Sequence, residues 1–217
     1  MPTRIALIHA TPVAMPPVRE AFQRGWREAE TVNLLDDALS LDLERAGQLN
    51  AAMKQRIATL ATYATSMGVA GILFTCSAFG EAIDTVAGSA RIPVLKPNEA
   101  MFEEAIRLGM TVGLLATFQP SIPSLEQEFM AMAAVLGKDV ILEAMWVPEA
   151  MEALTAGDAA THDRLIAETA PHLEHCDVVM LAQFSMARAG AVVQRAISIP
   201  VLTSPDSAVA RLKAVLA

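Results

Sequence analysis

Short apolar runs alternate with longer amphipathic stretches along the whole chain. Short runs rich in Val, Ile, Leu and Ala are typical of buried strands, whereas apolar residues three and four positions apart are typical of helices. Eight stretches are predicted to be strands: 4–10, 31–35, 71–76, 92–95, 111–116, 140–147, 177–182 and 199–202. The helical patterns lie between them, notably at 48–67, 98–108, 124–136, 160–174 and 204–216. This alternation predicts an α/β fold with parallel sheets and helical crossovers.

Glycines and one acidic segment interrupt these patterns. Gly68, Gly109 and Gly137 follow predicted helices, and glycine commonly ends a helix. The segment DDALSLDLERAG, at 36–47, is acidic and is predicted to be a solvated connection, with closure over a cleft as the alternative.

The sequence repeats itself at an offset of 107 positions. IPVL occurs at 92–95 and again at 199–202. The same shift places RIALIHATP on TVGLLATFQ, and GILFTCSAFGEA on VVMLAQFSMARA. Three blocks in one register indicate duplication of a βα unit. We therefore predict two pseudo-symmetric lobes, 1–107 and 108–217, each a parallel sheet with helices on both faces.

The ends of the predicted strands are the expected place for a site. Ligands of open α/β sheets bind outside the carboxyl ends of the strands, and two similar lobes could present those ends to one cleft. The residues expected there are His9, Thr11, Cys76 and Ser77 from the first half, and Thr117, Gln183 and Ser185 from the second.

The two cysteines occupy different positions. Cys76 follows the apolar run GILF where a strand gives way to a helix, and backbone N–H groups at such a point stabilise a thiolate. Cys176 precedes position 183 by seven residues, which places it about 20 Å from the strand end at ~3.3 Å per residue. We expect Cys176 to be a small buried residue of the core.

Three segments carry a resemblance to a known family. GILFTCSAFG, VGLLATFQPS and DVVMLAQFSMA are similar to the aspartate/glutamate/hydantoin racemase superfamily, which includes arylmalonate decarboxylases and maleate isomerases. The resemblance covers essentially the whole chain. It implies two pseudo-symmetric lobes, each supplying one cysteine to a face of the substrate's Cα, and no cofactor. It also suggests that the final helix crosses back to the first lobe.

The chain departs from the family at one position. The second family cysteine should end DVVMLA, where Gln183 stands, and the 107-residue offset also places Cys76 on position 183. Inversion by two bases needs an acid on one face and a base on the other, and glutamine has no proton to exchange near neutral pH. The expected function is therefore proton transfer by a single thiol, Cys76, at a carbon next to a carboxylate, as in a decarboxylase or isomerase.

Two other functions stay open. One is an amino-acid or hydantoin racemase in which another group replaces the second thiol, with His9 the next base to test. The other is a non-catalytic carboxylate-binding protein that kept the cleft. Gln183 either contacts the substrate or fills the space of the absent cysteine. His9 either shares a proton with Cys76 or is hydrogen-bonded locally.

The remaining polar residues have two interpretations each. The hydroxyls and backbone N–H groups of Ser77, Thr117 and Ser185 could hold a carboxylate or an enolate, or could cap helices. Lys96 is one of few cations expected near the strand ends. His162, His172 and His175 are expected to be solvated or at helix ends, and no spacing in the sequence predicts a metal site.

Composition narrows the function classes. The net charge is -8 and the 16 Lys and Arg residues form no dense cluster, which argues against nucleic-acid binding. Residues 57–80 carry no charge, but Gly68 and Gly71 interrupt them, so we predict a helix, a turn and a buried strand rather than a membrane span. With only two cysteines and no signal peptide expected, we predict a cytoplasmic protein with a small carboxylate substrate, and a homo-oligomer stays open.

Overall fold

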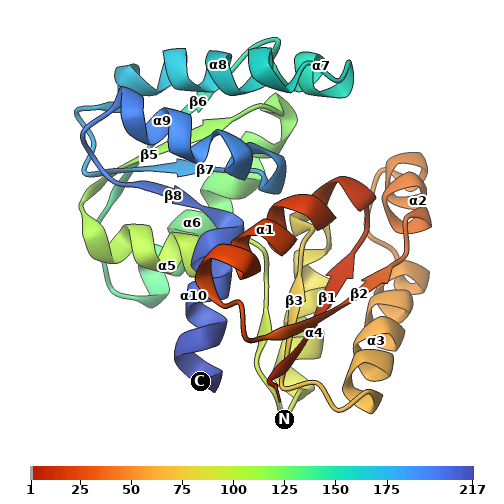
Figure 1. The fold of residues 1–217 in the computed structure, drawn as a ribbon. Coiled ribbons are helices and arrows are strands. Elements are labelled where there is room, and N and C mark those ends of the chain that lie inside the picture. Colours follow the sequence, from red (N-terminus) through yellow and green to blue (C-terminus); the bar gives the residue numbers. More distant parts are fainter. Residues whose placement is uncertain (1) are drawn as a thin grey trace. The chain divides into compact units, whose positions relative to one another are not determined.

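The computed structural model describes residues 2–217 as an α/β protein with eight strands in two parallel sheets (Figure 1). The chain divides into two compact units. The first holds the chain up to Ala100 together with Ala208–Ala217, and the second holds Met101–Ser207. Helices α5 (Glu99–Leu108) and α10 (Ser204–Leu216) carry the chain from one unit into the other.

The sheet of the first unit has the strand order β2-β1-β3-β4, and all its pairs are parallel. Its strands are β1 (Arg4–His9), β2 (Glu30–Leu35), β3 (Gly71–Phe74) and β4 (Val94–Leu95). The helices that lie within this unit are α1 (Met15–Gly25), α2 (Ala38–Ala46), α3 (Ala51–Ser66) and α4 (Gly80–Ser89).

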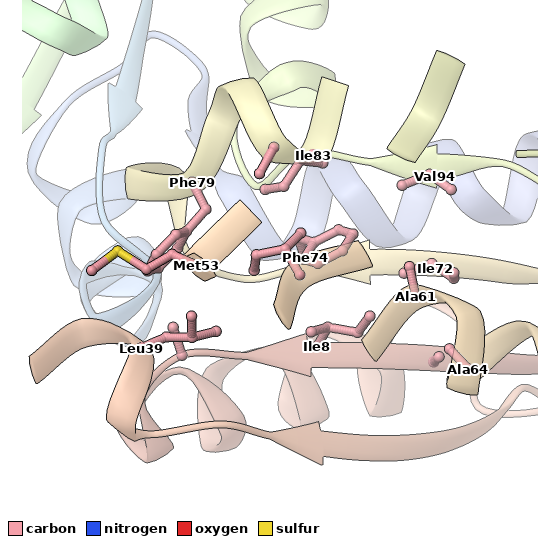
Figure 2. Close-up of a cluster of buried hydrophobic side chains, with 14 of the residues drawn as sticks. Ile8, Leu39, Met53, Ala61, Ala64, Ile72, Phe74, Phe79, Ile83 and Val94 are labelled. Atoms are coloured by element: carbon pink, nitrogen blue, oxygen red, sulfur yellow. The ribbon is translucent and has the colours of Figure 1, made fainter. Parts of the chain in front are cut away.

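One face of this sheet packs against α2, α3 and α4. Alternate strand residues such as Ile8 and Phe74 join side chains of these helices in one apolar cluster (Figure 2). Phe79, which follows the end of β3, lies at the same end of this cluster as Met53 of α3 (Figure 2). The chain beyond β3 is therefore anchored in the core immediately after position 76.

The opposite face of the same sheet contacts the end of the chain. A Cβ on Gly71 of β3 would lie 3.1 Å from Leu216 and 3.3 Å from Leu212, both in α10. A Cβ on Gly25, at the end of α1, would likewise lie 3.1 Å from the Val209 side chain of α10. Lys213 of α10 donates a hydrogen bond to the Gly25 carbonyl. The last ten residues thus pack on the first unit, and the helices α1 and α10 are neighbours there.

The sheet of the second unit has the same arrangement, with the order β6-β5-β7-β8. Its strands are β5 (Thr111–Ala116), β6 (Ile141–Trp146), β7 (Val178–Leu181) and β8 (Val201–Thr203). Besides most of α5, its helices are α6 (Ile122–Val135), α7 (Ala150–Thr155), α8 (Ala159–Thr169) and α9 (Gly190–Ala196).

Two apolar clusters show which helices cover each face of this sheet. Leu114 and Met180 pack with side chains of α5 and α6. Leu115 and Leu181, which point to the other face, pack with α8 and α9. Figure 1 shows α5 and α6 on one side of β5 and β7, with α8 and α9 on the other. Strands covered on both sides explain the continuous apolar runs in the sequence.

The eight predicted strands are confirmed, and the repeat is visible in their positions. β5 and β7 start 107 residues after β1 and β3 respectively. β6 departs from this offset, because Arg4 pairs with Glu30 whereas Thr111 pairs with Ile141, 111 residues further on. The offset returns to 107 before β7. The lobe limits of 1–107 and 108–217 stay a prediction.

The segment 36–47 differs from the prediction. It forms the helix α2 instead of a solvated connection. Leu39 and Leu43 stand four residues apart and pack into the core, and Gly47 ends the helix at a φ of 66°. Two of the four acidic side chains that suggested a loop, Asp36 and Asp42, are paired with Arg56 of α3.

The uncharged stretch 57–80 comprises the end of α3, a turn at Gly68 and the buried strand β3, as predicted. Within the described part of the chain, no helix is long and apolar enough to cross a membrane.

Candidate functional site

Cys76 stands two residues beyond β3, at the carboxyl end of the first sheet. Its backbone is extended, and it precedes a 3₁₀ turn, Ser77–Phe79, which leads directly into α4. The side chain is half-buried and is a free thiol. Ser77 is exposed whereas Phe79 is buried, so the turn presents its first residues outward and is held by Phe79.

The electrostatic surroundings of Cys76 differ from the prediction. Burial raises the pKa of its thiol, and a hydrogen bond from the backbone N–H of Ala78 lowers that pKa by less. The expectation of a stabilised thiolate was wrong in direction, because a short turn contributes one N–H group while the core removes water from the sulfur. At neutral pH the group carries its proton.

His9 lies at the end of β1 and has no exposed surface. Its Nδ1 lies 2.8 Å from the Thr75 hydroxyl, and its Nε2 lies 2.9 Å from Oδ1 of Asn33 on β2. Burial lowers the pKa of His9, and the hydrogen bond with Asn33 opposes this effect. His9 is therefore neutral, uses both ring nitrogens within the protein, and holds the residue that precedes Cys76.

The other polar groups expected in the first unit are placed as follows. Thr11 is half-buried and extended, one residue before the 3₁₀ turn Pro12–Ala14, and its hydroxyl does not cap that turn. Lys96 pairs with Asp84 of α4 at 3.0 Å, so its charge is met within the protein.

Gln183 occupies the corresponding end of β7 and is held by hydrogen bonds at both ends of its amide. Its Oε1 accepts from the backbone N–H of Thr117 at 3.0 Å and from the Thr117 hydroxyl at 3.3 Å. Its Nε2 donates to the Ser121 hydroxyl at 3.1 Å, and Ser121 in turn donates to the Phe118 carbonyl. The Gln183 amide thus fixes the ends of β5 and β7 to each other.

The 107-residue offset allows a position-by-position comparison, which shows that the two strand ends carry different polar residues. The positions in the first unit that correspond to Thr117 and Ser121 are Ala10 and Ala14, both buried. Conversely, the positions in the second unit that correspond to His9 and Thr75 are both alanine. The first unit therefore carries a thiol next to a histidine-supported threonine, while the second carries a polar amide network.

Ser185 is half-buried in the 3₁₀ segment Phe184–Ala189, which follows Gln183. Thr117 also lines a cavity of about 610 Å³ in the second unit. The cavity opens at the carboxyl ends of β5 and β6 and has mainly apolar walls, including Phe118, Trp146 and Met151, with Glu152 as its charged member.

The residues away from the strand ends follow the predictions in part. Cys176 is 3 % exposed in the apolar cluster beneath α8 and α9, as expected. His162 was expected to be solvated or at a helix end; it lies near the start of α8, but it has no exposed surface and its Nδ1 lies 2.7 Å from Asp163. His172 and His175 are exposed, as predicted.

The sequence did not indicate two of the residues that support these strand ends. Asn33 is a polar residue inside an apolar strand, TVNLL, and this interruption of the apolar pattern was the only sequence signal that could have pointed to it. Ser121 follows Pro120 at the start of a helix, where serine is usually a cap, so nothing separated it from ordinary capping serines.

One comparison with known proteins identifies a family. The family model described as Asp/Glu/Hydantoin racemase matches residues 9–212. Among curated protein sequences, none matches this chain significantly.

Solved structures show the same fold at low sequence identity. An aspartate racemase homologue from Pyrococcus horikoshii is 17 % identical, with a TM-score of 0.73 and 99 % of each chain covered. Allantoin racemase from Klebsiella pneumoniae is 14 % identical, with a TM-score of 0.74 over 98 % of this chain and 87 % of that one. A glycine-to-cysteine mutant of arylmalonate decarboxylase is 16 % identical, with a TM-score of 0.69 over 97 % and 93 % of the two chains.

Proposed function

The chain belongs to the Asp/Glu/Hydantoin racemase family, and from that premise we propose that it is a cofactor-independent enzyme that transfers one proton, through Cys76, to or from a carbon next to a carboxylate. The observation that carries the proposal is the difference between the two strand ends. One bears a free thiol, and the equivalent one bears Gln183, whose amide is already hydrogen-bonded and has no proton to exchange near neutral pH.

The raised pKa of Cys76 favours one direction of proton transfer. A thiol that keeps its proton at neutral pH is an acid before it is a base. The backbone N–H of Ala78 then stabilises the thiolate that remains after the proton has left. Protonation of a carbanion or enolate therefore suits Cys76 better than abstraction of a proton from a resting substrate, which supports a decarboxylase-like reaction.

The corresponding reaction of a malonate-type substrate balances without a cofactor. The bond between Cα and one carboxylate breaks, carbon dioxide leaves, and the electron pair stays on Cα as an enolate of the remaining carboxylate. The S–H bond of Cys76 breaks as its proton forms the new C–H bond on one face of Cα. The thiolate regains a proton from solvent, so the thiol is restored for the next cycle.

The groups around the strand ends have supporting roles in this proposal. Ser77 and Thr11 are accessible at the end of the first sheet and supply hydroxyl and N–H donors to the substrate carboxylate. In the second unit, the half-buried Ser185 offers its hydroxyl to a carboxylate, whereas the buried Thr117 donates its N–H and hydroxyl to the Gln183 amide and orients it. His9 is a positioning residue, because its ring has no exposed surface and acts on Cys76 only through Thr75.

The cavity beside Thr117 suggests which kind of substrate the enzyme takes. Its walls are formed by Phe118, Trp146 and Met151, which would bury an apolar substituent but give a charged side chain few partners. We therefore propose a substrate with an alkyl or aryl group on the carbon that carries the carboxylate. A free catalytic thiol also requires a reducing compartment, so the proposed location is the cytoplasm.

Incubation with substrate in heavy water tests the proposal. A panel of substituted malonates, amino acids and hydantoins is followed by NMR for deuterium at Cα and by chiral chromatography for the configuration of the product. We expect turnover of a malonate with one deuterium delivered to one face, and no turnover in Cys76→Ala.

The alternatives give different results in the same experiment. Loss of optical activity from an amino acid or hydantoin would identify a racemase with a second base other than a thiol. Tight binding of carboxylates with no deuterium incorporation from any member of the panel would identify a non-catalytic binding protein. Either result would overturn the one-thiol enzyme.

A further inference from the structure

A second group of reactive side chains lies on the α8–α9 face of the second sheet, away from the strand ends. It consists of Glu143, His175 and Cys176. The Glu143 Oε2 is 2.9 Å from the His175 Nε2, and the Cys176 Sγ is 3.9 Å from the same nitrogen. One ligand atom from each residue lies within 4.8 Å of the other two.

The fold brings these residues together although 32 positions separate Glu143 from His175. Glu143 belongs to the edge strand β6 and pairs with Gly113 of β5, which also pairs with Val179 of β7. Because Gly113 has no side chain, Leu173 packs directly over it, and a Cβ there would lie 3.0 Å from Leu173. The turn that follows Leu173 thus lies close to the sheet, within reach of Glu143.

The backbone that carries His175 and Cys176 is fixed on both sides. The N–H of Cys176 donates to the Leu173 carbonyl at 3.0 Å, and the N–H of Asp177 donates to the Thr111 carbonyl at 2.8 Å. The Asp177 carboxylate accepts from the N–H groups of Met110 and Thr111. The adjacent side chains of His175 and Cys176, both of types that bind metals, are therefore carried by a backbone that is fixed by hydrogen bonds.

The donor set matches a borderline-soft divalent cation. A thiolate, an imidazole and a carboxylate are the three side-chain types that bind Zn²⁺, and three protein ligands leave one position for water or another ligand. Bonds of about 2.0–2.3 Å to a tetrahedral zinc ion place the ligand atoms about 3.3–3.6 Å apart. The separations of 2.9 and 3.9 Å lie on either side of that range, so small side-chain rotations would bring all three atoms onto one ion.

The charges around the group also favour a cation. The carboxylates of Glu143 and of the adjacent Asp177 both place negative charge near the Cys176 sulfur. A divalent ion would offset both carboxylates. Glu143 and His175 are partly exposed, which gives an ion a path from solvent to the buried sulfur.

We propose that Glu143, His175 and Cys176 form a three-ligand site for zinc(II) that ties the edge strand β6 to the turn before β7. The site is distinct from the strand ends that carry Cys76 and Gln183. Its role is to hold the amino-terminal side of the second sheet, and it does not depend on the proposed reaction.

Metal titration of the untagged, metal-free protein tests the site. Zn²⁺ is added against a chromophoric chelator to obtain stoichiometry and affinity, and Co²⁺ is added to record absorption. We expect one ion per chain, a sulfur-to-cobalt charge-transfer band, and the visible bands of tetrahedral cobalt. Cys176→Ser should abolish the charge-transfer band, and His175→Gln and Glu143→Gln should each weaken Zn²⁺ binding at least ~10-fold.

Two variants serve as controls, and a second measurement guards against misfolding. Cys76→Ser removes the other thiol and His172→Gln removes a nearby exposed imidazole, and both should bind Zn²⁺ within about twofold of the unmodified protein. Zn²⁺ should raise the unfolding temperature of the unmodified protein but not that of His175→Gln, whose altered side chain is exposed. Absence of stoichiometric binding, or binding that Cys76→Ser removes and Cys176→Ser does not, would overturn the proposal.

Discussion

Cys76 and Cys176 are both free thiols, but their surroundings differ in ways that govern reactivity. Cys176 is almost wholly buried and its pKa is about 11, whereas Cys76 is half-buried and receives a backbone hydrogen bond that favours its thiolate. The pKa of Cys76 is also raised by burial, so the greater accessibility of Cys76 is the difference that favours its reaction.

We predict that alkylation at neutral pH labels Cys76 first. Iodoacetamide labelling followed by peptide mass spectrometry gives the rate at each site. Because burial raises the pKa of Cys76, the rate should keep rising as the pH increases beyond 8.5 instead of levelling off near pH 7. Preferential labelling of Cys176, or a plateau below pH 7, would contradict this description of the site.

The buried His9 predicts how stability depends on pH. Its pKa is lowered in the folded protein, so the unfolded chain binds a proton more readily below its ordinary pKa of ~6.5. The contribution of His9 to the free energy of unfolding should therefore be greatest above that pH and decrease as the pH falls through it. The decrease is ~1.4 kcal/mol for each unit of difference between the pKa values of His9 in the unfolded and folded protein.

Urea unfolding at a series of pH values measures this effect. His9→Gln should lose much of the decrease between pH 7 and 5, although it is less stable overall because Thr75 and Asn33 lose their partner. His172→Gln, an exposed histidine, should keep the decrease. Equal pH profiles for His9→Gln and the unmodified protein would show that His9 is not the group responsible.

Sequence patterns predicted individual residues unevenly. The strand-end positions of Cys76 and Gln183 followed from apolar runs and the 107-residue offset, because both depend on local spacing. The partners of these residues did not follow. Ser121 and Asn33 reach the site through pairing of strands distant in sequence, and the raised pKa of Cys76 depends on how completely Phe79 and its neighbours exclude water.

Gly109, after a helix, and Gly88, within a helix, offer a matched pair of substitutions that tests how closely side chains pack against the backbone. A Cβ on Gly109, after α5, would lie 2.1 Å from the Cβ of Asp177, whereas a Cβ on Gly88, in α4, would meet nothing within 4 Å. Gly109→Ala should therefore lower the free energy of unfolding by ~1–3 kcal/mol. Gly88→Ala should raise it by up to ~1 kcal/mol, because alanine is the better helix former.

Chemical denaturation of both variants measures this contrast, with the same spectroscopic probe and buffer. An unchanged stability of Gly109→Ala would mean that the Asp177 carboxylate is not held against the turn after α5. The sequence marked Gly109 only as a helix end, and the close approach of Asp177, 68 residues later, explains why glycine is required at that position.

The cavity at the ends of β5 and β6 leads to a prediction about substrate choice. Trp146→Ala removes a large apolar wall and should raise KM for substrates with an alkyl or aryl substituent by about tenfold, equivalent to ~1.4 kcal/mol. Compact substrates should change little. Tyr63→Ala, which removes an exposed aromatic side chain of α3, is the control. Equal effects of Trp146→Ala on large and compact substrates would exclude the cavity as a binding site.

Elements were predicted where the apolar pattern was long and continuous. All eight strands were identified, whereas α2 was mistaken for a connection because its acidic residues masked the pair Leu39 and Leu43. Asp36 and Asp42, two of those acidic residues, pair with Arg56, which belongs to the next helix along the chain. A pattern confined to one segment does not contain that information.

The whole molecule combines two similar units whose strand ends have diverged. Both sheets have the same order and the same parallel pairing, so a common origin for the two halves accounts for the fold. The thiol is present in one unit, and the polar network of Thr117, Gln183 and Ser121 is present in the other. This divergence motivates the central claim, which is the proposal that proton transfer depends on the thiol of one unit alone.

Restoring the second thiol should change the outcome of the reaction. Gln183→Cys gives the second unit a group that can exchange protons, so we expect it to create or raise racemising activity, measured by polarimetry. Gln183→Ser, which also removes the amide but supplies no thiol, is the control and should not racemise. Equal optical rotation over time for Gln183→Cys and Gln183→Ser would contradict the role assigned to position 183.

Deuterium delivery to the product, measured with and without Cys76, tests the central claim most directly. A substrate from the panel is turned over in heavy water, and NMR with chiral analysis reports how much deuterium enters Cα and on which face. The account predicts a single deuterated enantiomer from the unmodified protein and no proton transfer from Cys76→Ala, with His172→Gln unaffected. A racemic product from the unmodified protein, or continued deuterium incorporation by Cys76→Ala, would contradict it.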